Sequence, residues 1–144
     1  LGWLLGNRVL LLTHMGRTSG LPHETVVEVI RYDQTTDACV VASGWGSNSD
    51  WFRNIQKTPE VTITLGSRKL TASAVVLSET GGAQELLDYA RRHPTAFGEI
   101  TALFTGQRIS GTEENCRALA RVIPIVAFRP TRPISANQVW LKSK

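Results

Sequence analysis

Residues 61–76 read VTITLGSRKLTASAVV, and this stretch decides the class of fold. Apolar and polar side chains alternate on both sides of Gly66-Ser67, as in two strands that each bury one face. A two-residue connection with glycine first is typical of a type II′ hairpin turn. The stretch therefore predicts an antiparallel hairpin, to which the rest of the chain adds strands.

Further strands are predicted where apolar or β-branched residues are bounded by polar or turn-forming ones. The segments are 8–13, 24–32, 38–43 and 123–128. The first three follow one another closely, so we expect them to pair as a meander. Helical spacing of apolar residues predicts helices from Ser49 to Thr58, over 83–93 and over 112–123, while 94–106 is a shorter helix or an irregular segment. About six strands and three helices indicate an α+β fold with a small antiparallel barrel.

Composition limits the classes of function. The 144 residues, 42% hydrophobic and 19% charged, suit a single globular domain over 1–144. No apolar run approaches the ~18 residues of a membrane span. The chain opens at Leu1 rather than methionine, so we expect a natural N-terminal segment to precede it. The net charge of +4 comes from scattered basic residues without interleaved aromatics, so we expect no nucleic-acid partner. Cys39 and Cys116 lack a CxxC spacing and the three histidines lack a metal-ligand spacing, so reduced thiols and no metal are expected.

The loop from Gly16 to Gly20 is the most informative local segment. Two glycines flank Arg17, Thr18 and Ser19, which offer a guanidinium, two hydroxyls and backbone N–H groups. Such a set could bind a phosphate or carboxylate, although an ordinary strand–strand loop has the same composition.

A second candidate site lies where the strand ending at Ser43 gives way to a helix. Gly44 and Gly46 leave room beside the backbone, and Trp45 or Trp51 could cover a ring, although Trp51 also has the spacing of a core residue. No set of nucleophile, base and acid is apparent. Glu24 and Glu28 share one face of a strand, and we expect them to be a surface pair. If the protein is an enzyme, a cofactor should supply the difficult chemistry.

Four motifs together resemble a known family. Residues 10–22 (LLLTHMGRTSGLP), the block VASGWG at 41–46 with DWFRNI at 50–55, TPEV at 58–61 and IPIV at 123–126 are similar, in order and spacing, to the deazaflavin-dependent nitroreductase family. The resemblance covers about residues 8–129.

The resemblance implies a split β-barrel of the FMN-binding type that binds the 8-hydroxy-5-deazaflavin coenzyme F420. It implies a cytoplasmic or membrane-peripheral oxidoreductase of actinobacterial type, which passes a hydride to an activated double bond, a quinone or a nitro compound. By position, Arg17, Thr18 and Ser19 would contact the coenzyme's phosphate and tail. The ring and ribityl chain would be lined by His23, Glu24, Thr25, Val26 and Val27, by Ala42, Ser43, Gly44 and Trp45, and by Asp50, Trp51, Phe52, Arg53 and Asn54.

Two positions depart from the family's pattern. Thr18 stands where the family usually has lysine, and His23 stands where it often has arginine. The loss of positive charge keeps FMN open as an alternative cofactor, and a non-catalytic cofactor or lipophile carrier is the alternative function. The segment 97–113 has no counterpart in the family's pattern.

The interpretation is therefore a single-domain deazaflavin-dependent reductase, with Ser43 as the candidate proton donor to a small-molecule electron acceptor. A homodimer and a peripheral membrane contact through the missing N-terminal segment are further expectations.

Overall fold

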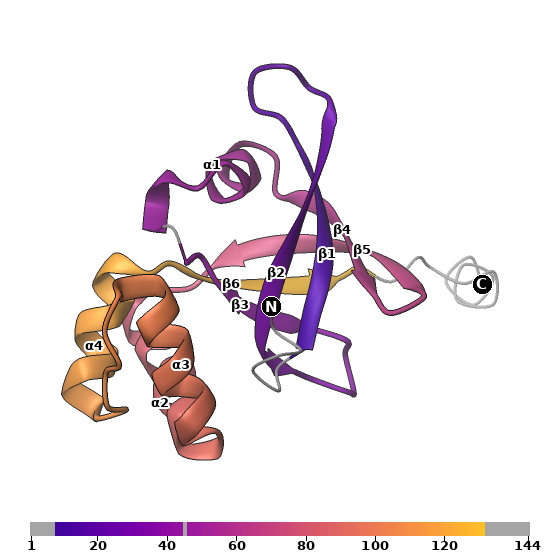
Figure 1. Ribbon diagram of the computed structural model, residues 1–144. Coiled ribbons are helices and arrows are strands. Elements are labelled where there is room, and N and C mark those ends of the chain that lie inside the picture. The colour runs from indigo at the N-terminus through magenta and orange to yellow at the C-terminus, as the bar shows by residue number, and fades with distance from the viewer. Residues whose placement is uncertain (1–7, 45, 132–144) are drawn as a thin grey trace.

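Six strands close into a barrel in the computed structural model, which describes residues 8–44 and 46–131 (Figure 1). The order around the barrel is β1-β2-β3-β6-β5-β4, and β4 pairs with β1 to close it. All neighbouring strands are antiparallel, which confirms the predicted barrel and the meander of the first three strands. The strands are β1 (Arg8–Met15), β2 (Pro22–Tyr32), β3 (Cys39–Ala42), β4 (Glu60–Leu65), β5 (Arg68–Val76) and β6 (Ile125–Pro130).

The hairpin predicted from residues 61–76 is formed by β4 and β5. Leu65 pairs with Arg68 across the turn, and Gly66 has a φ of +60°, a backbone conformation that favours glycine. Val61 and Ile63 point into the barrel and are almost completely buried. The apolar face of β4 therefore lies on the core as predicted, whereas Thr62 and Thr64 on its other face are half-buried and Val76 at the end of β5 is 43% exposed.

Helix α1 (Asp50–Lys57) lies across one end of the barrel, next to the β1–β2 hairpin (Figure 1). Trp51, Phe52 and Ile55 are buried and belong to the same apolar cluster as Leu10 and Leu12 of β1. The helix is thus fixed by its apolar face, and its N-terminal end remains beside the hairpin.

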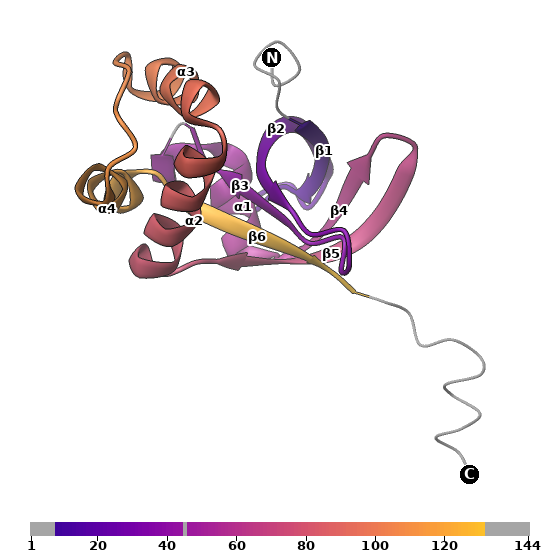
Figure 2. The same cartoon turned by 90° about the horizontal axis from the view of Figure 1, so that it is seen from below.

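The other helices cover the outer face of the barrel formed by β2, β3 and β6 (Figure 2). They are α2 (Glu79–Arg92), α3 (Pro94–Thr105) and α4 (Glu113–Val122). The described residues thus hold four α-helices and one 3-10 turn (Gly46–Asn48), one helix more than the tally from the sequence. Residues 94–105 are fully helical because Phe97 and Ile100 are buried in the apolar cluster of this layer.

The expectation that Glu24 and Glu28 form a surface pair is wrong for Glu28. Glu24 is exposed, but Glu28 is half-buried and its Oε2 is buried without a hydrogen-bond partner among the described residues. Loss of hydration raises the pKa of the Glu28 carboxyl. The spacing placed both carboxylates on one face of β2 but could not show how that face is covered.

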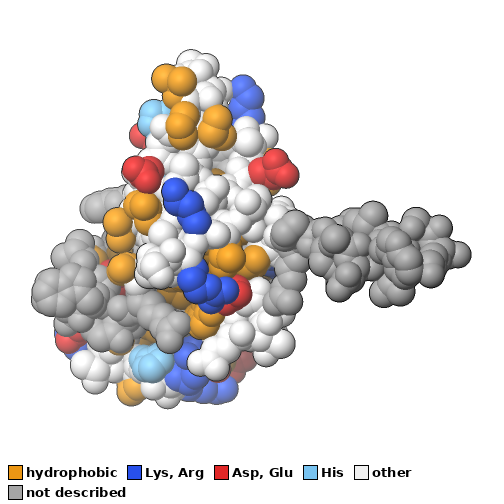
Figure 3. All heavy atoms as spheres, turned by 90° about the vertical axis from the view of Figure 1, so that its right-hand side faces the viewer, with side chains coloured by type: hydrophobic (Ala, Val, Ile, Leu, Met, Phe, Trp, Pro, Cys, Tyr) orange, Lys and Arg blue, Asp and Glu red, His pale blue; other side chains and the backbone are white. Residues whose placement is uncertain are grey.

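Apolar side chains are exposed at the tip of the β1–β2 hairpin, the uppermost part of Figure 3. Leu21, in the connection between the two strands, is 62% exposed. None of the helices in residues 8–44 and 46–131 is long and apolar enough to cross a membrane.

Candidate functional site

A pocket of about 700 Å³ lies between the β1–β2 hairpin and the N-terminal end of α1. Its walls come from two segments that are more than 20 residues apart in the sequence. The lining residues are His14, Gly16, Arg17, Thr18, Ser19, His23, Glu24, Thr25, Asn48, Ser49, Asp50, Trp51 and Asn54.

The Gly16–Gly20 loop has a compact backbone. The Gly16 N–H donates to the Leu21 carbonyl at 2.8 Å, and the Gly20 N–H donates to the Gly16 carbonyl at 2.9 Å. Gly20 has a φ of +70°, and a Cβ on Gly16 would lie 2.5 Å from Ser19 Oγ. Both glycines are therefore needed, Gly20 for the backbone conformation and Gly16 for the close approach of Ser19.

Three side chains of α1 hold this loop in place. Asn54 Oδ1 accepts from Arg17 N at 3.0 Å and from Arg17 Nη1 at 2.8 Å. Arg17 Nη2 donates to Asp50 Oδ1 at 3.2 Å, and Lys57 Nζ donates to the Arg17 carbonyl at 2.7 Å. The Arg17 guanidinium is thus oriented by the protein, with its side chain 31% exposed at the pocket.

The N-terminal end of α1 faces the pocket without a side-chain cap. Ser49 occupies the N-cap position, but its hydroxyl makes no capping hydrogen bond and lies 2.9 Å from Ser43 Oγ instead. Ser43 Oγ donates its single proton to the Gly46 carbonyl at 2.7 Å, so Ser49 is the donor within the serine pair. Because no side chain caps the first turn, its N–H groups are available to an anionic or carbonyl oxygen.

Nine residues expected at the site line this pocket. They are Arg17, Thr18, Ser19, His23, Glu24, Thr25, Asp50, Trp51 and Asn54. The hairpin supplies six of them and α1 supplies three, so the structure brings together the two candidate segments that the sequence indicated separately.

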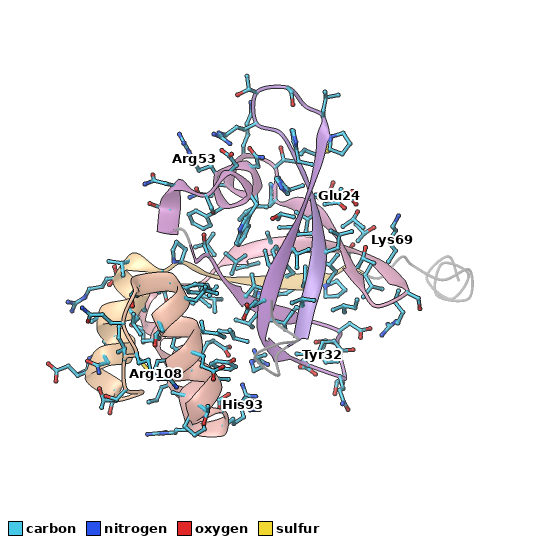
Figure 4. All side chains as sticks on the ribbon, viewed as in Figure 1. Glu24, Tyr32, Arg53, Lys69, His93 and Arg108 are labelled. Carbon is cyan, nitrogen blue, oxygen red and sulfur yellow. The ribbon has the colours of Figure 1, made fainter. Side chains whose placement is uncertain are left out.

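Other expected residues do not line the pocket. Val27, Ala42, Ser43 and Phe52 are buried, whereas Val26 is 61% exposed. Arg53 is exposed on α1, as its label in Figure 4 shows. Trp45 lies outside the described residues.

The space beside Gly44 has a different use from the one expected. A Cβ on Gly44 would lie 2.5 Å from Phe104 Cε1, so this glycine admits a side chain of α3 rather than leaving room for a ligand. Trp51 is 7% exposed and packs against Phe52 and Phe128, with ring centroids 6.1 and 6.2 Å away. Trp51 therefore belongs mainly to the core and contributes an edge to the pocket.

His14 lines the pocket although it was not among the expected site residues. The alternation of side chains along β1 could have identified His14 as a pocket residue. Leu10, Leu12 and His14 share the inward face of the strand, and the barrel interior ends at His14. Burial and the neighbouring His23 lower the pKa of His14, while Asp50 opposes them. The imidazole is therefore neutral near pH 7.

Comparison with solved structures shows the fold. Protein Atu2129 of unknown function from Agrobacterium tumefaciens superposes with a TM-score of 0.59 at 13% identity, over 86% of this chain and 48% of the other. This chain thus spans about half the length of that protein. An F420-H2 dependent reductase, FDR-A, has a TM-score of 0.51 at 15% identity over 85% and 94% of the two chains. A pyridoxamine 5′-phosphate oxidase-related, FMN-binding protein from Nostoc punctiforme has a TM-score of 0.56 at 11% identity over 85% and 71%.

The sequence comparisons give the family. No curated protein matches the chain significantly. Residues 2–102, well over half of the chain, match the profile of the F420H(2)-dependent quinone reductases. The expectation of a deazaflavin-dependent oxidoreductase on a split barrel is thus confirmed, and the chain belongs to the F420H(2)-dependent quinone reductase family.

Proposed function

We propose that the pocket between the β1–β2 hairpin and α1 binds the deazaflavin coenzyme, and that the enzyme reduces a quinone, an activated double bond or a nitro compound. One observation carries the proposal: two distant segments converge on one pocket and present hydrogen-bond donors to it. Its volume of about 700 Å³ falls within the usual range for cofactor sites, roughly 300–1,000 Å³.

The donors in the walls fit a ligand with a phosphate and ring carbonyls. Thr18 and Ser19 offer hydroxyls, the uncapped first turn of α1 offers N–H groups, and Arg17 offers a fixed guanidinium. Asp50 and Glu24 place negative charge in the same walls and offset the positive charge of Arg17. This balance supports the expectation that the acidic tail of the coenzyme adds little affinity.

The lining residues of the hairpin would hold the anionic part of the coenzyme, and those of α1 would close over its ring. When bound, the reduced coenzyme supplies a hydride, and the acceptor takes up a proton together with it. Ser43 reaches the pocket only through Ser49, whose hydroxyl donates to it at 2.9 Å. In this arrangement the Ser43 proton points to the Gly46 carbonyl, so the proposed route from Ser43 requires both hydroxyls to turn, with Ser43 donating to Ser49 and Ser49 donating into the pocket.

Titration of the protein with the oxidised coenzyme, followed by the coenzyme's fluorescence, tests this assignment. Arg17→Ala should weaken binding by about 1.5–3 kcal/mol, the range for a hydrogen bond to a charged group. Arg91→Ala on α2 is the control, because Arg91 is exposed and does not line the pocket. Equal affinity of a folded Arg17→Ala variant and the parent would refute the assignment.

FMN is the competing cofactor, since the same donors suit a ligand with one phosphate and no acidic tail. A parallel titration with FMN separates the two, and tighter binding of FMN would favour the alternative. Turnover of the reduced coenzyme with a soluble quinone separates an enzyme from a carrier, which binds the coenzyme without consuming it. The expected homodimer stays a prediction, which sedimentation equilibrium can test.

A further inference from the structure

Asn54 lies at the centre of a short hydrogen-bond chain beneath the pocket. Its side chain is 4% exposed and joins Arg17 of the loop to His14 of β1. Asn54 Oδ1 accepts from the backbone N–H and from Nη1 of Arg17, and neither of these nitrogens can accept a hydrogen bond in return. The orientation of the amide is therefore fixed, with Oδ1 toward Arg17 and Nδ2 toward His14.

This orientation determines the tautomer of His14. Asn54 Nδ2 carries only hydrogens and lies 3.0 Å from His14 Nδ1, so Nδ1 must accept. A neutral imidazole with an accepting Nδ1 carries its proton on Nε2. His14 is therefore an Nε2–H donor at the wall of the pocket, and no hydrogen bond to Nε2 is present within the described residues.

A protonated His14 imidazolium is incompatible with this hydrogen-bond chain. An imidazolium would direct Nδ1–H at the Asn54 amide hydrogens, and turning the amide would cost both hydrogen bonds from Arg17. The titratable and charged groups around His14 are His23 of β2, Asp50 of α1 and Arg17 of the loop. The rings of His14 and His23 are stacked, with their centroids 5.9 Å apart. Burial and His23 lower the pKa of His14, which agrees with a neutral donor.

We propose that His14 is a ligand-contacting residue whose Nε2–H donates to an oxygen of the molecule bound in the pocket, and that Asn54 and Arg17 are the positioning residues that set its tautomer. The proposal rests on the proposed function for the identity of the ligand. The tautomer itself follows from the protein's own hydrogen bonds. A neutral donor of this kind suits a carbonyl oxygen or a ring oxyanion, because a preorganised N–H stabilises negative charge by hydrogen bonding and a neutral imidazole does not give up its proton to that oxygen.

The tautomer can be measured in the ligand-free protein. Long-range nitrogen–proton NMR spectra distinguish Nε2–H from Nδ1–H imidazoles, and the protein has three histidines, so His14→Asn identifies the signals of His14. We expect the Nε2–H form in the parent. Asn54→Asp keeps an acceptor for Arg17 but offers a second carboxylate oxygen to Nδ1, and should move the His14 proton to Nδ1 or charge the ring. An Nδ1–H form in the parent would overturn the proposal.

Two substitutions separate ligand contact from a structural role. Asparagine at position 14 retains an acceptor near the place of Nδ1, whereas glutamine retains an N–H donor near the place of Nε2. We expect His14→Asn to weaken binding of the oxidised coenzyme about tenfold, or about 1.4 kcal/mol, and His14→Gln to recover at least part of that loss. If His14 only accepts the hydrogen bond of Asn54 and does not touch the ligand, His14→Asn should bind the coenzyme as tightly as the parent and more tightly than His14→Gln. That order would overturn the proposal.

His93→Gln is the matched control, because His93 is exposed at the end of α2 and does not line the pocket (Figure 4). The two measurements also separate this inference from the proposed function. An Nε2–H tautomer in a protein that binds no deazaflavin would refute the cofactor assignment and leave the hydrogen-bond chain intact. Tight coenzyme binding that is unchanged in both His14 variants would refute the inference and leave the proposed function intact.

Discussion

Replacing Asn54 with alanine removes the side chain that holds the Gly16–Gly20 loop against α1. The side chain is 4% exposed and makes three hydrogen bonds, two from Arg17 and one to His14. The bond from the guanidinium is charge-assisted and contributes about 1.5–3 kcal/mol, while the other two contribute about 0.5–1.5 kcal/mol each. Because neighbouring contributions are not additive, we expect a loss of about 3 kcal/mol in the free energy of unfolding.

Urea unfolding followed by circular dichroism measures this loss, and thermal unfolding should show a decrease in Tm of about 10 °C. Gln56→Ala is the control, because Gln56 is exposed on the same helix and should change stability by less than about 0.5 kcal/mol. The deazaflavin affinity of Asn54→Ala should fall as well, since Arg17 and His14 lose their orientation.

A double-mutant cycle with Arg17→Ala refines the test. Arg17→Ala removes the guanidinium but keeps the backbone N–H that also donates to Asn54, so the two substitutions should couple by about 1 kcal/mol. A loss below about 0.5 kcal/mol in Asn54→Ala, or strictly additive effects, would show that the loop is held by its own backbone and not by α1.

The remaining predictions concern charge and backbone conformation. Glu28→Gln should raise the free energy of unfolding by about 1 kcal/mol at pH 7, because it removes a buried charge without a partner. Since burial raises the pKa of Glu28, the gain should disappear as the pH falls below the ordinary glutamate value of 4.5, and a gain that persists there would contradict the explanation. Gly20→Ala should cost about 1–2 kcal/mol at a φ of +70°, whereas Gly20→Asn should cost less, and equal costs in denaturant unfolding would exclude a conformational cause. Coenzymes with short and long acidic tails should bind within about tenfold of each other, about 1.4 kcal/mol. The double substitution Thr18→Lys with His23→Arg should increase the difference in affinity between the two tail lengths, and this increase should be smaller at high salt. If the parent protein discriminates strongly between short and long tails in a competition assay, other cationic side chains must bind the acidic tail.

The sequence alone determined the strands and the antiparallel class of the fold. Alternation is a local property, so residues 61–76 indicated the β4–β5 hairpin, its turn and its buried face without any knowledge of neighbours. The buried face of α1, with Trp51, Phe52 and Ile55, followed from helical spacing in the same way. Four short motifs in order were enough to indicate the family, because each is tied to a specific turn or strand end.

Only the tertiary structure decided which side chains meet. The resemblance indicated Asn54 as a ring-lining residue, and His14 follows the strand predicted at 8–13, but only closure of the barrel brought the two into contact beneath the Gly16–Gly20 loop. Gly44 suggested space for a ligand, but a side chain from α3, sixty residues later in the chain, occupies it. Periodicity reports the direction of a side chain relative to its own strand or helix. The partner that it meets depends on how distant segments pack, and that information is not contained in any single stretch of the sequence.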